Sequence, residues 1–102
     1  MAITLTGEPV LAEKAESWGM IYKAVDDENL MTEALKLTTQ LATGPTRGLA
    51  ETKKRIRESS LNTLQQELDL ERDAMRELGY SKDYAEGVAA FIEKRKPVFT
   101  GQ

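Results

Sequence analysis

Apolar residues recur every three or four positions along most of the chain, which is the spacing of one helix face. These stripes predict helices over about residues 11–18, 29–43, 45–59, 63–78 and 81–96. The apolar run from Met20 to Val25 is short and could be extended. We therefore expect an all-α fold of four or five helices, with residues 1–102 forming one domain.

The last predicted helix has a clear start and a clear stop. Ser81 can cap its N-terminus by accepting a backbone hydrogen bond, and Asp83 places a negative charge in the first turn. The basic run 94–96 occupies the predicted last turn, and Pro97 ends the helix. Gly87 costs about 1 kcal/mol at a mid-helix position, so we expect it to pack closely against another helix.

Turn and capping residues separate the earlier helices. Gly19 and Gly44 are placed to stop helices, and Pro45 can begin one. The acidic pair 26–27 is expected to supply a cap and first-turn charge for the second helix, whereas Leu11 cannot cap the first. Two pairs can form a capping box at the start of the fourth helix, Thr63 with Gln66 or Asn62 with Gln65.

Charged runs are assigned to solvated helix faces. In the helix over 45–59, the pattern turns Leu49, Thr52 and Ile56 inward. It turns five charged residues outward: Lys53, Lys54, Arg55, Arg57 and Glu58. The acidic residues between 67 and 77 alternate with Arg72 and Arg76, which favours pairing along one exposed face over a metal site.

Composition narrows the chemistry that the chain can perform. The net charge is −3, which argues against a nucleic-acid partner. There is no cysteine and no histidine, so thiol nucleophiles, disulfides and the usual general base and zinc ligand are missing. No apolar run reaches the roughly 20 residues that span a bilayer. We expect a soluble cytoplasmic protein with no bound metal and no membrane partner.

Two separated motifs resemble the enoyl-CoA hydratase/isomerase (crotonase) family. One is the C-terminal run Ser81-x-Asp83-x-x-Glu86-Gly87-x-x-Ala90-Phe91-x-Glu93-Lys94-Arg95-x-Pro97-x-Phe99. The other is Gly7-Glu8-Pro9, Ala12-Glu13-x-Ala15, Trp18-Gly19-Met20-Ile21 and Val25-Asp26. Within the family, residues 41–50 and 83–91 are most similar to the ring-epoxide isomerases of phenylacetate degradation.

The resemblance implies that the chain is the C-terminal helical domain of such a protein, without the N-terminal spiral core. This domain caps the acyl-CoA site and contributes to assembly of a trimer or a dimer of trimers. The implied reaction is hydration or isomerisation of an unsaturated or ring-epoxide acyl-CoA through a stabilised enolate, with coenzyme A entering as part of the substrate. No residue here matches a catalytic position of the family, so we expect this chain alone to be inactive. The alternative is a stand-alone helical module that binds another protein.

Phe91 and Lys94 are the candidate site residues. An aromatic ring and an ammonium group three residues apart on a helix suit an adenine ring with a nearby phosphate. The resemblance assigns this pair to the nucleotide end of coenzyme A. The competing interpretation is that Phe91 belongs to the core and that Lys94 only complements the helix dipole.

Overall fold

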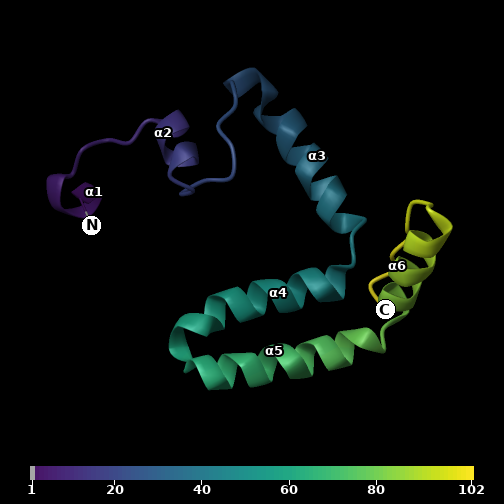
Figure 1. The fold of residues 1–102 in the computed structure, drawn as a ribbon. Helices are drawn as coiled ribbons and strands as arrows, with labels where there is room; N and C mark the ends of the chain where they lie inside the picture. The colour runs from purple at the N-terminus through teal and green to yellow at the C-terminus, as the bar shows by residue number, and fades with distance from the viewer. Residues whose placement is uncertain (1) are drawn as a thin grey trace. The chain divides into compact units, whose positions relative to one another are not determined.

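The computed structural model describes residues 2–102, and these residues form helices and connecting segments without a β-strand (Figure 1). The chain divides into two compact units, the first ending at Leu35 and the second running from Lys36 to Gln102. The predicted all-α fold is confirmed. One short helix, α1 (Ala2–Thr6), was not predicted from the pattern.

The first unit consists of short helices joined by turns. Helix α2 (Ala12–Ser17) begins after Leu11. Leu11 makes no side-chain cap, as predicted, because its side chain has no group that can accept a hydrogen bond. Gly19 has a φ of +71° and stops the helix as predicted, because glycine adopts this conformation without strain. The segment from Met20 to Val25 forms no strand.

Helix α3 (Leu30–Ala42) follows a single 3₁₀ turn, η1 (Asp27–Asn29). The predicted acidic cap is wrong, because Asp26 precedes η1 without making a side-chain hydrogen bond to it, whereas the predicted first-turn charge is present as Asp27 in η1. The C-terminal stop is as predicted: Gly44 follows α3, and Pro45 stands directly before the next helix.

Helices α4 (Thr46–Glu58) and α5 (Leu64–Gly79) lie side by side as an antiparallel hairpin (Figure 1). A 3₁₀ turn, η2 (Ser59–Leu61), connects them. Of the two possible capping boxes, the structure contains Thr63 with Gln66: the Gln66 N–H donates to the Thr63 hydroxyl, and the Thr63 N–H donates to the Gln66 side chain. Two backbone donors at the start of α5 are thereby satisfied.

Helix α6 (Lys82–Glu93) follows α5 after a short turn, and Ser81 caps it as predicted by accepting the Tyr84 N–H at 3.0 Å. The helix is shorter than predicted, because residues 94–96 lie beyond its end and not in its last turn. The remaining C-terminal tail, residues 94–102, runs back along α6, since the Asp83 N–H donates to the Gln102 carbonyl.

Arg55 departs most clearly from the predicted inside and outside faces. It was placed on the solvated face of α4, but only 8% of the residue is exposed. Conversely, Ile56 is 70% exposed although the pattern turned it inward, and Leu49 and Thr52 are exposed as well. The periodicity located an amphipathic helix correctly. It could not tell which face meets a neighbour within this chain.

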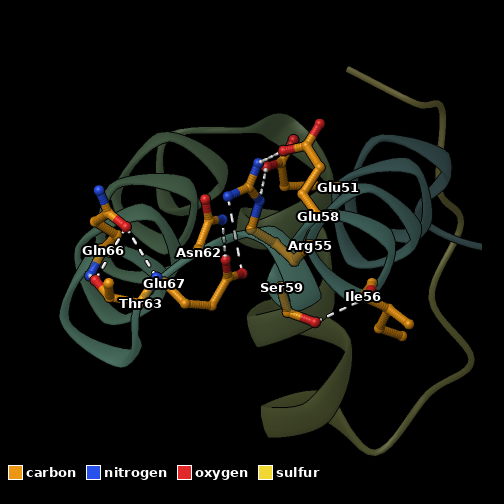
Figure 2. A network of polar contacts seen from close by, with 9 residues as sticks. All are labelled: Glu51, Arg55, Ile56, Glu58, Ser59, Asn62, Thr63, Gln66 and Glu67. Atoms are coloured by element: carbon orange, nitrogen blue, oxygen red, sulfur yellow. Dashed lines mark hydrogen bonds and ion pairs between the residues drawn. The ribbon is translucent and has the colours of Figure 1, made fainter.

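Arg55 is the centre of a polar network that joins α4 to the start of α5 (Figure 2). Its guanidinium pairs with Glu51 at 3.1 Å and with Glu58, and lies 3.8 Å from a carboxylate oxygen of Glu67. Asn62 donates to the same Glu67 carboxylate at 2.6 Å. Glu67 is therefore a hairpin contact, not the solvated charge that the acidic run predicted.

Two of the remaining acidic residues pair along their own helix as predicted, whereas Glu77 accepts from Arg47 of α4 at 2.9 Å. Arg72 pairs with Asp69 at 2.7 Å and Arg76 with Asp73 at 3.6 Å, and all four side chains are exposed. Across residues 2–102, no three acidic, histidine or cysteine side chains converge as a metal site would require. No helix in this range has the length and apolar character needed to cross a membrane.

Candidate functional site

The site is built at the C-terminal end of α6, where the chain makes a tight reversal. The Arg95 N–H donates to the Ala90 carbonyl at 3.0 Å, and the Lys94 N–H donates to the Phe91 carbonyl at 3.4 Å. This pair of bonds is a Schellman motif, in which the residue after the helix adopts the left-handed conformation. Here that residue is Lys94, with φ 53° and ψ 38°.

A lysine at this position is strained. Lys94 is the only residue other than glycine with a positive φ between residues 2 and 102. The left-handed conformation costs an L-amino acid roughly 1–2 kcal/mol, whereas glycine adopts it freely. Glycine at 94 would therefore give a more stable helix end. Backbone strain of this kind concentrates where a side chain has a function, which makes Lys94 a candidate on structural grounds.

The reversal is closed by a clasp consisting of Glu86, Arg95 and the backbone of Val98. The Arg95 guanidinium donates to the two Glu86 oxygens at 2.6 and 2.8 Å, and the Val98 N–H donates to Glu86 at 2.8 Å. These bonds, the Arg95 pair first, lower the pKa of Glu86 from 4.5 to about 2. The same carboxylate, followed by Glu93, raises the pKa of Arg95. The clasp is therefore ionised throughout the neutral range.

Asp83 holds the other end of the C-terminal tail. It is 5% exposed and accepts backbone N–H bonds from Thr100 at 2.7 Å and from Gly101 at 2.9 Å. The sequence had assigned Asp83 only a favourable charge near the helix dipole. The missed role is long-range, because the partners lie 17 and 18 residues later in the chain.

Phe91 is 86% exposed, so the interpretation of Phe91 as a core residue is wrong for this chain. Lys94 makes no ion pair with another described residue. The prediction that Phe91 and Lys94 share a helix face is not met, because Lys94 lies outside α6. What links the two residues is the hydrogen bond from the Lys94 N–H to the Phe91 carbonyl.

Phe91 also borders an apolar groove of about 420 Å³ between α4, the end of α5 and α6. Its wall includes Tyr84, Val88 and Phe99. The Phe99 ring rests against Gly87, where an added Cβ would lie 3.6 Å from the nearest ring carbon. The close neighbour of Gly87 is therefore the C-terminal tail and not another helix, which corrects the sequence-based expectation.

The chain matches the enoyl-CoA hydratase/isomerase family over residues 1–102. It is 50% identical to 1,2-epoxyphenylacetyl-CoA isomerase of Escherichia coli, an alignment that covers all of this chain and 39% of the relative. It is 35% identical over 100 residues to trans-2-decenoyl-[acyl-carrier-protein] isomerase of Streptococcus mutans, covering 38% of that protein.

Solved structures give the same assignment. An enoyl-CoA hydratase/isomerase from Mycobacterium abscessus aligns with a TM-score of 0.91 and 35% identity, covering 99% of this chain and 39% of that one. An enoyl-CoA hydratase subunit from Geobacillus kaustophilus aligns with a TM-score of 0.87 and 36% identity. The fold is therefore that of the helical part of crotonase enzymes. The chain belongs to the enoyl-CoA hydratase/isomerase family and spans about two-fifths of the length of the relatives it matches.

Proposed function

We propose that this chain forms the C-terminal helical domain that caps the acyl-CoA site and contributes to subunit assembly in a hydratase or isomerase of the family. The observation that carries the proposal is the exposure of its apolar stripes. Ile92 is 72% exposed, Met75 74% and Leu64 77%. Ala90 is the only buried hydrophobic residue of the described chain. Helix faces of this kind are stable when they cover another protein surface.

The reaction of the whole protein is proposed as isomerisation or hydration of an unsaturated or ring-epoxide acyl-CoA through an enolate. Family membership and the 50% identity to an epoxyphenylacetyl-CoA isomerase support this. Two acidic side chains of low exposure are engaged in structure, Asp83 with the tail and Glu67 with the hairpin. The carboxylate that moves the proton and the N–H groups that hold the thioester oxygen are assigned to the part of the protein outside these residues.

The nucleotide end of coenzyme A is proposed to bind at Phe91 and Lys94. An exposed aromatic face can stack on adenine, and an unpaired ammonium can meet a phosphate. The test is a titration of the isotope-labelled chain with coenzyme A, followed by amide chemical shifts. The amides of residues 88–96 are expected to shift. Phe91→Ala and Lys94→Ala should each weaken binding, and unchanged binding in both would overturn this assignment.

The assembly role predicts that the isolated chain associates with itself. Sedimentation velocity over a range of concentrations is expected to reveal oligomers. Replacing Ile92 and Met75 with Gln should shift the chain toward monomer, whereas Lys53→Gln, which replaces one exposed polar residue with another, should not. A folded monomer at all concentrations would contradict the assembly role. It would favour the alternative, a stand-alone helical module for a different protein partner.

A further inference from the structure

We propose that Glu86 and Arg95 are positioning residues for Lys94: their ion pair holds the strained reversal after α6 so that the Lys94 ammonium is presented, unpaired, to a phosphate of the coenzyme A nucleotide. The inference rests on the proposed function, since it takes the nucleotide to be the ligand of Lys94. It adds a role for two residues that do not themselves touch the ligand.

The first argument concerns the backbone. Left-handed lysine at a helix end is an unfavourable conformation that surrounding contacts must hold in place. Glu86 supplies such contacts to the segment that follows Lys94, because it binds the Arg95 guanidinium and the Val98 N–H together. The backbone is held as well, since the Arg95 N–H donates to the Ala90 carbonyl and the Lys94 N–H donates to the Phe91 carbonyl. The reversal at Lys94 is thus tied to α6 by side-chain and backbone hydrogen bonds.

The second argument concerns charge. Lys94 and Arg95 are neighbouring cations, but the carboxylates around them are all directed to Arg95: Glu86 binds it through two oxygens, and Glu93 lies 2.5 Å from its Nε. Arginine suits this role, because its planar fork can engage one carboxylate with two parallel bonds and lysine cannot. The clasp therefore neutralises Arg95 and leaves the Lys94 ammonium available to an anion.

A double-mutant cycle tests the inference, with adenosine 3′,5′-bisphosphate and coenzyme A as probes in amide-shift titrations of the 102-residue chain. Lys94→Ala is expected to weaken binding by about tenfold, the order of one charge-assisted hydrogen bond. Glu86→Gln keeps an acceptor for Val98 but loses the ion pair, and it is expected to weaken binding by about threefold or more. In the double variant, Glu86→Gln should add nothing to Lys94→Ala, because Glu86 acts only through Lys94.

Three controls make the result specific. Lys96→Ala removes a neighbouring positive charge that has no ion pair and should change affinity less than Lys94→Ala. Arg95→Lys keeps the charge but not the fork, so it should weaken binding as Glu86→Gln does. Lys94→Gly should raise the melting temperature by removing the backbone strain and still lose affinity. The amide shifts of residues 82–90 verify that α6 stays folded in each variant.

The outcomes separate the two claims. Wild-type affinity in Glu86→Gln, together with weak binding in Lys94→Ala, would overturn the positioning role and leave the proposed nucleotide site standing. Additive effects in the double variant would also overturn it. If neither Lys94→Ala nor Phe91→Ala affects binding, or if coenzyme A does not bind, the proposed nucleotide site fails and the inference fails with it.

Discussion

Single residues in this chain carry information that their type alone does not reveal. Gly87 lies against the C-terminal tail and Gly101 lies within it, and the structure places different constraints on the two residues. At Gly87 the backbone is helical and there is room for a methyl group against Phe99. At Gly101 the φ is +77°, and a Cβ would lie 2.7 Å from the Thr46 hydroxyl.

Gly87→Ala is expected to be neutral or to stabilise the chain by up to about 1 kcal/mol, because alanine favours the helix by that amount and the new contact of 3.6 Å is ordinary. Urea denaturation followed by circular dichroism measures the change. Ala85→Gly, an exposed position in the same helix, is the matched control and should cost about 1 kcal/mol. Destabilisation by Gly87→Ala comparable to that control would mean that the tail tolerates no methyl group there.

Gly101→Ala is expected to destabilise the docked tail by about 1–3 kcal/mol, combining left-handed strain with the clash at Thr46. Hydrogen exchange at the Thr100 and Gly101 amides, which bind Asp83, should become faster. Gly7→Ala isolates the strain, since Gly7 has a φ of +65° with open space around it. Equal losses in the two variants would show that the clash contributes nothing.

At the scale of elements, charged side chains join segments that sequence periodicity treats as independent. Glu86 ties the tail to α6, and Arg55 ties α4 to the start of α5. The pattern predicted α4 and α5 correctly but placed Arg55 in solvent. A helical wheel records which residues share a face. It does not record that Glu67 approaches Arg55 from the next helix.

The clasp formed by Glu86, Arg95 and the Val98 N–H should weaken at acid pH. The pKa of Glu86 is lowered to about 2 in the folded chain, so its contribution is present above the ordinary value of 4.5 and is lost as the pH falls toward 2. The Val98 amide shift should follow this loss in a pH titration. In Glu86→Gln the Val98 shift should be insensitive to pH over the same range. A Val98 transition centred near 4.5 in the unmodified chain would contradict the clasp.

Arg55→Met is expected to destabilise the hairpin by about 2–3 kcal/mol. Removing the guanidinium leaves Glu67, only 15% exposed, without its cation, while Glu51 and Glu58 keep partial access to water and reduce the penalty below that of a fully buried pair. Thermal unfolding measures the loss. Arg57→Met removes an exposed arginine of the same helix and should change stability by less than about 0.5 kcal/mol. Equal losses of stability in Arg55→Met and Arg57→Met would show that Arg55 contributes no more than an exposed arginine does.

At the scale of the whole molecule, the chain exposes more surface than a compact monomer of its mass would. The chain exposes 8726 Å², whereas a compact monomer of its 11.4 kDa would expose about 5,800 Å². Even if its two units were each compact and did not touch, they would expose only about 6,900 Å². The excess agrees with the exposed apolar stripes and with helices that complete their packing on another surface.

The thermal stability of the chain is therefore expected to depend on protein concentration. If association buries the apolar faces of α4 to α6, mass action raises the unfolding midpoint as concentration rises. Scanning calorimetry over about a hundredfold range of concentration tests this, with the Ile92 and Met75 double variant as the control that should lose the dependence. A midpoint independent of concentration in the unmodified chain would count against self-association.

The sequence by itself determined helices α2 to α6, the Ser81 cap, the Gly19 stop and the family, because these depend on local spacing and on residues close together in the chain. The tertiary structure decided the rest. That Asp83 binds residues 100 and 101, that Glu86 fixes the turn at Lys94, and that Arg55 is buried all depend on distant segments meeting. The helical period determines which face of its own helix a side chain occupies. Which distant segment contacts that face depends on the tertiary packing.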